Sequence, residues 1–192
     1  TGVGTINDDD ATPSLSIDDI TTDPEAATSA QFTVTLDAAS GKTVTVDYAT
    51  SDVTATAGSD YTAIGSTTLT FSPGTTTQTI DVSILADTLD EDNETYNITL
   101  SNPVNATISD NTGVGTINDD DATPSLSIND ITTDPEAATT AQFTVTLDAA
   151  SGKTVTVDYV TSDATATAGS DYTAIGSTTL TFSPGTTTQT ID

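Results

Sequence analysis

The sequence contains no Cys, Met, Trp, His or Arg, and its only cationic side chains are Lys42 and Lys153. Without cysteine there is no disulfide, no thiol chemistry and no zinc site of the cysteine type. Two cations stand against 29 acidic residues, for a net charge of -27. Nucleic acid is therefore excluded as a partner, because phosphate binding requires clustered cations. The same charge opposes adsorption to an anionic membrane.

Long hydrophobic runs are also missing. No apolar stretch approaches the roughly 20 residues of a membrane span, and no signal peptide heads the chain, so we expect no membrane insertion. Hydrophobic residues make up only 34% of the sequence, but they alternate regularly with polar ones, which is not typical of disorder. A composition rich in Thr, Ser, Asp and Gly, without Cys or Met, favours an extracellular or cell-surface location.

What the chain does have is a long internal repeat. A shift of 111 residues aligns 81 residue pairs, of which only four differ: Asp18/Asn129, Ser29/Thr140, Ala49/Val160 and Val53/Ala164. A period of this length is the size of a domain, and it is much longer than a solenoid repeat of 20–50 residues. The chain is therefore predicted to be a tandem array of nearly identical domains.

Domain boundaries follow from the segment DDDATP, whose Asp and Pro residues interrupt the apolar pattern and predict a linker. We expect residues 1–11 to be the last strand and linker of a preceding repeat. One complete domain is expected at 12–121, and an incomplete second copy at 122–192, without the counterpart of residues 82–111.

Strands are predicted from alternating apolar residues in the complete repeat. Seven segments show this pattern or border on it: 14–17, 30–37, 42–50, 67–71, 77–85, 94–101 and 112–118. Seven short strands in about 100 residues, without helical periodicity, indicate an all-β, immunoglobulin-like antiparallel β-sandwich. The glycines of the last segment, TGVGTIN, indicate either a bulge or a close approach of the backbone to another group.

Acidic residues gather in two clusters of this domain. The hairpin ADTLDEDNETY carries Asp87, Asp90, Glu91, Asp92 and Glu94, and the last strand ends in Asp119–Asp121. Because successive antiparallel strands alternate in direction, both clusters are expected at one pole. The connection between the first and second predicted strands carries Asp23 and Glu25, and the connection between the third and fourth carries Asp60. Both connections are expected at the same pole.

Carboxylates brought together in this way repel one another unless a cation neutralises them. Calcium takes six to eight oxygen ligands in flexible geometry, so it suits a site built from loops better than magnesium does. The alternative is a merely solvated acidic surface, which is the usual meaning of a single charge run. Convergence of four segments favours a metal site. Neither the EF-hand loop nor the Gly-rich calcium nonapeptide is present.

The segments AGSDY, LTFSPG and LSNP, followed by GTINDDD, give the whole 12–121 unit a close resemblance to the Calx-beta domain family. That resemblance implies an immunoglobulin-like β-sandwich that binds Ca²⁺ at one pole. Carried across position by position, it implies these metal ligands: Glu25, Asp60, Asp87, Glu91, Glu94, Asp119, Asp120 and Asp121.

Departures from the family pattern lower the expected number of ions. Calcium-rich members have two aspartates where this chain has Ala86–Asp87, so one to three ions are expected rather than four. Asp90 and residues 109–111 are secondary candidates. In the incomplete copy Glu136 and Asp171 match the family ligands, and Asp8–Asp10 match the terminal triad, but these half-sites are expected to be empty or weak.

The resulting hypothesis is a calcium-binding structural repeat of an extracellular bacterial surface, adhesin or matrix protein, in which Ca²⁺ stiffens the domain pole and the joint between domains. Neighbouring repeats or other copies of the chain are the expected partners. One alternative is a subunit of a self-assembling β-rich filament that exchanges strands between neighbours. Another is a Ca²⁺-dependent adhesion domain. Paired carboxylates also serve glycosidases, but without His, Arg or Trp nearby we expect no enzyme.

Overall fold

The computed structural model of the protein describes residues 1–7, 9–22, 25–132 and 140–192. The chain divides into two compact units, of which the first comprises Thr1–Asp87 and Asn93–Asp120. The second comprises Thr88–Asp92 and Asp121–Asp192. The part of the chain that the structure describes contains no helix, and therefore no helix long and apolar enough to cross a membrane. The prediction of an all-β protein is confirmed.

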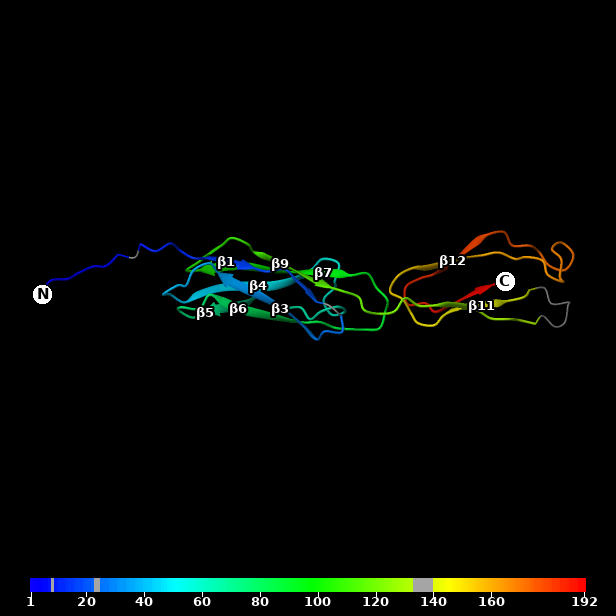
Figure 1. Ribbon diagram of the computed structural model, residues 1–192, viewed down its shortest axis with the longest axis horizontal. Coiled ribbons are helices and arrows are strands. Elements are labelled where there is room, and N and C mark those ends of the chain that lie inside the picture. The colour runs from blue at the N-terminus through cyan, green and yellow to red at the C-terminus, as the bar shows by residue number, and fades with distance from the viewer. Residues whose placement is uncertain (8, 23–24, 133–139) are drawn as a thin grey trace. The chain divides into compact units, whose positions relative to one another are not determined.

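Unit 1 consists of two β-sheets packed face to face (Figure 1). One sheet has the order β6-β3-β1-β8, formed by Thr77–Ser83, Ser29–Leu36, Ser14–Ile17 and Thr107–Ile108. The other has the order β2-β9-β7-β4-β5, formed by Ile20–Thr22, Thr112–Ile117, Glu94–Val104, Val44–Asp52 and Thr67–Phe71. All seven predicted strands are present, and the predicted β-sandwich is confirmed.

Two further strands, β2 and β8, were not predicted. Each pairs in parallel with a strand of its sheet, β2 with β9 and β8 with β1, whereas the other pairs are antiparallel. Asp18 and Asp19 separate β1 from β2. The carboxylate of Asp18 accepts the N–H of Thr33 at 2.6 Å, and that of Asp19 accepts the N–H of Val114 at 2.7 Å. These two aspartates thus support the chain where it passes from one sheet to the other.

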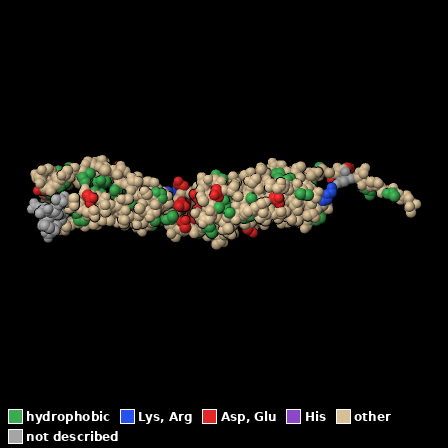
Figure 2. All heavy atoms as spheres, turned by 180° about the vertical axis from the view of Figure 1, so that it is seen from behind, with side chains coloured by type: hydrophobic (Ala, Val, Ile, Leu, Met, Phe, Trp, Pro, Cys, Tyr) green, Lys and Arg blue, Asp and Glu red, His purple; other side chains and the backbone are tan. Residues whose placement is uncertain are grey.

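The core of unit 1 lies between the sheets and follows the alternation of the sequence. In β3, Phe32, Val34 and Leu36 are buried, while the intervening threonines are partly exposed. Burial of such side chains is the main favourable contribution to folding, at about 1.5–3 kcal/mol each. The outer faces of the strands carry mostly Thr and other polar residues, in agreement with the largely neutral polar surface in Figure 2.

Gly113 and Gly115 are buried on the face of β9 that lies against this core. Any other residue at these positions would place its side chain in the core. A Cβ atom on Gly115 would lie 2.5 Å from Cζ of Tyr96, and one on Gly113 would lie 2.6 Å from the carbonyl oxygen of Asp18. Of the two readings of these glycines, the close approach is therefore the one observed.

Unit 2 repeats the first part of this architecture. Its strands β10 (Leu126–Ile128), β11 (Phe143–Leu147) and β14 (Thr188–Ile191) form one sheet, and β12 (Val155–Tyr159) pairs with β13 (Thr178–Phe182). Val145, Leu147, Phe182 and Ile191 form its small core. The pairing of β10 with β11 has the register of β1 with β3, as the near-identity of the two sequences requires.

Candidate metal centre

Asp60 belongs to a tight turn formed by the segment TAGSDY. Gly58 has φ +95°, a conformation that favours glycine, and its N–H donates to the carbonyl oxygen of Tyr61 at 2.9 Å. The Oδ2 atom of Asp60 accepts the N–H of Thr56 at 2.5 Å, so one carboxylate oxygen closes the turn. The position of the Asp60 carboxylate is therefore fixed by its own loop.

Two tyrosines lie close in sequence to the acidic residues: Tyr61 directly follows Asp60, and Tyr96 lies two residues after Glu94. The rings of Tyr61 and Tyr96 are stacked with centroids 4.5 Å apart, and the hydroxyl of Tyr61 donates to Oδ1 of Asp52 at 2.6 Å. Burial, reinforced by Asp52, raises the pKa of Tyr61 to about 12. Burial also raises the pKa of Tyr96, whose hydroxyl has no hydrogen-bond partner among the described residues. Both phenols are therefore neutral at physiological pH, and the stacked pair belongs to the core of unit 1.

Glu94 is the first residue of β7, opposite Ile117 at the end of β9. It lies two residues before the buried Tyr96, so the packing of that ring fixes the start of the strand. Glu91 lies in the preceding segment, and both glutamates are half-buried. Partial burial strengthens the repulsion between neighbouring carboxylates, because it reduces screening by water.

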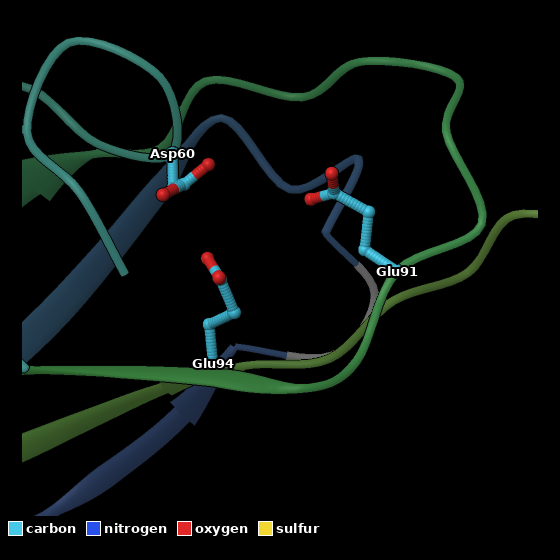
Figure 3. Close-up of side chains that lie close together, drawn as sticks. All are labelled: Asp60, Glu91 and Glu94. Atoms are coloured by element: carbon cyan, nitrogen blue, oxygen red, sulfur yellow. The ribbon is translucent and has the colours of Figure 1, made fainter. Parts of the chain in front are cut away.

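Asp60, Glu91 and Glu94 converge on a common space (Figure 3). One carboxylate oxygen from each lies within 4.8 Å of the others. Figure 3 shows the three side chains pointing toward one another from the Asp60 turn, the Glu91 loop and the start of β7. Three acidic groups at this separation favour a bound cation between them, which would offset their mutual repulsion.

The two remaining segments of the predicted pole meet beside this cluster. Glu25 is only 9% exposed; its N–H donates to the carbonyl oxygen of Asn118 at 2.9 Å, and its Oε1 accepts the N–H of Asp87 at 3.2 Å. The N–H of Asp119 donates to Oδ1 of Asn93 at 3.1 Å. The segment between β2 and β3, which carries Glu25, is thus hydrogen-bonded to the acidic hairpin, and so is the end of β9. The alternation of strand direction predicted that these segments share a pole.

Of the eight residues predicted as ligands, the structure brings three together in one carboxylate group. The other five, which lie outside that group, are Glu25, Asp87, Asp119, Asp120 and Asp121. Asp87 and Asp120 are exposed, whereas Asp119 and Asp121 are half-buried. Their assignment as ligands stays a prediction.

The secondary candidates have other surroundings. The carboxylate of Asp90 is bonded to Ser151, Lys153 and Thr123. Residues 109–111 precede β9, at the end of that strand remote from Asp119. Asp171 repeats the turn of Asp60, accepting the N–H of Thr167 at 2.8 Å. Asp8, Asp23 and Glu136 lie outside the described residues.

The donors present suit Ca²⁺. All three are carboxylates, and they come from loops and a strand end, where distances can adjust to a cation of 2.3–2.6 Å ligand distance. No sulfur or imidazole is available anywhere in the sequence to favour zinc or copper. The chemistry of the site therefore fits a hard divalent cation.

Sequence reasoning did not assign a role to Tyr61, Tyr96 or Lys153. The alternation within residues 94–101 puts Tyr96 in phase with the apolar Ile98 and Leu100, but it cannot show that the Tyr96 ring stacks on Tyr61. One feature of the sequence could have drawn attention to Lys153. The chain has only two lysines against 29 acidic residues, and both lie at the same position of their repeats.

Comparison with known proteins gives a consistent family. The model of the Calx-beta domain matches residues 8–123 and again residues 118–192. No curated protein matches the chain.

Solved structures with the same fold include the CBD12 tandem of CALX1.2, 25% identical, with a TM-score of 0.54 over 93% of this chain and 73% of that one. The calcium-binding domain CBD12 of CALX1.1 is 24% identical, with a TM-score of 0.53 over 92% of this chain and 73% of that one. The apo form of the Calx CBD1 domain is 24% identical, with a TM-score of 0.54 over 58% of this chain and all of that one.

Proposed function

The chain belongs to the Calx-beta domain family, and from this premise we propose that it is a calcium-binding structural repeat whose metal is held around Asp60, Glu91 and Glu94. Calx-beta domains bind Ca²⁺, and the similar CBD12 structure of CALX1.1 is named as a calcium-binding domain. The observation that carries the proposal is the convergence of three carboxylates from separate positions of the sequence within 4.8 Å.

Calcium requires more oxygen ligands than these three residues supply. Glu25, Asp87 and Asp119 lie on segments hydrogen-bonded to one another or to the same hairpin, and we include their carboxylates in the proposed ligand set for this reason. Asp120 and Asp121 follow directly and complete the proposed set. Binding would neutralise part of the repulsion within this pole and couple the end of β9 to the hairpin.

At the level of the whole protein, we propose a spacer role in an extracellular or cell-surface protein. Near-identical domain-sized repeats, the absence of cysteine and a net charge of -27 support this assignment. We take residues 12–121 as the repeating domain, with 1–11 and 122–192 as parts of adjacent repeats. Calcium would then stiffen the acidic pole of each repeat and the linker that follows it.

Calorimetric titration of the full chain with Ca²⁺ tests the metal assignment. Asp60→Asn removes a charged ligand and is expected to weaken the tightest binding step at least about tenfold, which corresponds to roughly 1.4 kcal/mol. Asp171→Asn is a matched control, because Asp171 occupies the same turn in unit 2 but lies outside the group formed by Asp60, Glu91 and Glu94.

Equal affinities of the Asp60→Asn variant and the wild type would contradict the assignment. So would an equal loss of affinity in both variants, because the two turns would then contribute equally to binding. Glu94→Gln should reproduce the effect of Asp60→Asn if the ion lies between these two side chains.

A further inference from the structure

Another acidic residue of the hairpin, Asp90, lies in a different environment from the group formed by Asp60, Glu91 and Glu94. It belongs to Thr88–Asp92, the short segment that forms part of unit 2. Asp90 is only 5% exposed and Ser151 only 2%, and they are among the few buried polar residues in the described part of the chain. A buried carboxylate is stable only when its oxygens are paired or hydrogen-bonded.

The partners of Asp90 come from the turn Ser151–Lys153. Nζ of Lys153 lies 2.9 Å from Oδ1 of Asp90, and the hydroxyl of Ser151 lies 3.2 Å from Oδ2. The carbonyl oxygen of Asp90 accepts the N–H of Gly152 at 3.1 Å and lies 3.0 Å from the Ser151 hydroxyl, whose single proton is shared between this oxygen and Oδ2. The hydroxyl of Thr123 also lies 3.4 Å from Oδ1. Each of the three oxygens of Asp90 thus has at least one donor within hydrogen-bond distance in unit 2.

Gly152 fits this contact because it has no side chain. A Cβ atom there would overlap Oε1 of Glu91 and lie 2.6 Å from its Cγ, so the glutamate side chain packs directly over the turn. Gly41, at the same position of the first repeat, has nothing within 4 Å of such an atom. In this chain the close approach thus occurs at Gly152, whose turn contacts the acidic segment, and not at Gly41.

The turn itself is the same in both repeats. The N–H of Lys153 donates to Oγ of Ser151 at 3.0 Å, and that of Lys42 donates to Oγ of Ser40 at the same distance. Its conformation therefore does not depend on the contact with Asp90. A preformed turn loses little conformational freedom when a segment binds it.

Charge explains why a lysine occupies this turn. The acidic segment carries Asp90, Glu91 and Asp92 in a chain with only two lysines. Lys153 contacts Asp90 and also lies 3.7 Å from the carboxylate of Asp92. Without it, Asp90 would be buried as an uncompensated charge, which strongly disfavours the bound arrangement.

We propose that the Ser151–Lys153 turn is a docking site for the acidic segment Thr88–Asp92, and that it holds this segment through Asp90 without any bound metal. Asp90 is then a docking residue rather than a metal ligand. The same interaction positions Glu91, which lies between the docked Asp90 and Asp92 and contributes to the carboxylate group of the candidate metal centre. Only this last consequence depends on the proposed function.

Hydrogen exchange of the full chain in EGTA, followed by NMR, tests the docking directly. The reporter is the amide of residue 152, which donates to the carbonyl oxygen of Asp90. In the wild type, this amide is expected to exchange at least about tenfold more slowly than the amide of Gly41, because the equivalent turn lacks that contact. Similar exchange at the two amides in EGTA would overturn the proposal.

Matched substitutions identify the residues responsible. Lys153→Gln and Gly152→Ala are expected to accelerate exchange at residue 152 at least about tenfold, whereas Lys42→Gln and Gly41→Ala change it less than about twofold. The amide of Val145 in β11 reports the integrity of unit 2 in each variant. No acceleration in Lys153→Gln would contradict the docking role of the lysine. Because calcium is absent throughout, these results do not depend on whether the chain binds it.

Discussion

Gly115 shows how a single residue links the last strand to the core. The Tyr96 ring occupies the space in which a side chain at residue 115 would lie, with its hydroxyl 2.8 Å from the position of a Cβ atom. Tyr96 in turn packs edge-on against Phe32 and stacks on Tyr61. The position of β9, and with it the terminal aspartates, therefore depends on the absence of a side chain at Gly115.

Gly115→Ala is expected to destabilise unit 1 by about 1–3 kcal/mol, the usual cost of forcing extra volume into a packed core. Gly4→Ala is the matched control, because Gly4 occupies the same position in the identical decapeptide and has nothing within 4 Å of its Cβ position. Its effect should stay within about 0.5 kcal/mol. Urea unfolding measures both variants, and equal stabilities would contradict the packing described here.

The sequence alone indicated that these glycines mark a bulge or a close approach, but it could not decide between them. That choice depends on which ring lies across from β9, a contact between residues 19 positions apart. Alternation does place Tyr96 on the inner face of its strand. It does not reveal the stacking on Tyr61, or that the Tyr96 hydroxyl has no hydrogen-bond partner among the described residues, because side-chain packing has no signature in strand periodicity.

At the scale of the elements, the seven strands with clear alternation could be predicted, and the two short ones could not. β2 and β8 have three and two residues, too few to show a period of two. What defines β2 is the break at Asp18 and Asp19, whose side chains bond to backbone groups of the two sheets. Two adjacent aspartates in a sequence do not by themselves show which backbone groups they will meet.

Asp47 connects three strands of the larger sheet. Its carboxylate accepts a bond from the hydroxyl of Thr68 at 2.6 Å in β5, and one from the amide of Asn102 at 3.1 Å in β7. These two donors, Thr68 first, hold the pKa of Asp47 below its ordinary value. A carboxylate with a lowered pKa in the folded state stabilises the fold above the pKa of the unfolded chain.

That contribution is fully present at neutral pH and is lost as the pH falls through the lowered pKa of the folded state. We therefore expect NMR titration to give a pKa for Asp47 below the roughly 3.9 of an unperturbed Asp. Thr68→Val should raise this pKa toward that value, because it removes the main donor. An ordinary Asp47 pKa in the wild type, or no change in the variant, would contradict the role of Thr68.

At the scale of the whole molecule, the sequence predicted which segments share a pole, and the hydrogen bonds among Glu25, Asp87, Asn93, Asn118 and Asp119 agree with that prediction. It could not predict which carboxylates face one another. Of the residues in the hairpin, Glu91 and Glu94 point toward Asp60, whereas Asp90 is bonded to Ser151 and Lys153. Side-chain direction within an irregular loop depends on its tertiary contacts, and these have no periodic signal.

With a net charge of -27, the stability of this protein should respond to cations in general. Monovalent salt screens exposed charges without requiring a particular geometry, with a Debye length of about 8 Å at physiological ionic strength. A specific calcium site should instead discriminate between ions of equal charge, because Mg²⁺ demands shorter distances and octahedral coordination. Comparison of the two ions at constant ionic strength therefore separates site binding from screening.

Thermal unfolding of the full chain in Ca²⁺, in Mg²⁺ and in EGTA is the measurement that tests specific calcium binding by this protein. Free Ca²⁺ at about 100 times its dissociation constant stabilises the binding unit by roughly 2.7 kcal/mol, which raises the Tm by on the order of 10 °C for a domain of this size. We expect this increase for wild-type protein in Ca²⁺, a much smaller one in Mg²⁺ and none in EGTA, and in Asp60→Asn we expect it to fall by about half or more at the same Ca²⁺ concentration. A Tm that is the same in EGTA and in millimolar Ca²⁺ would contradict this expectation.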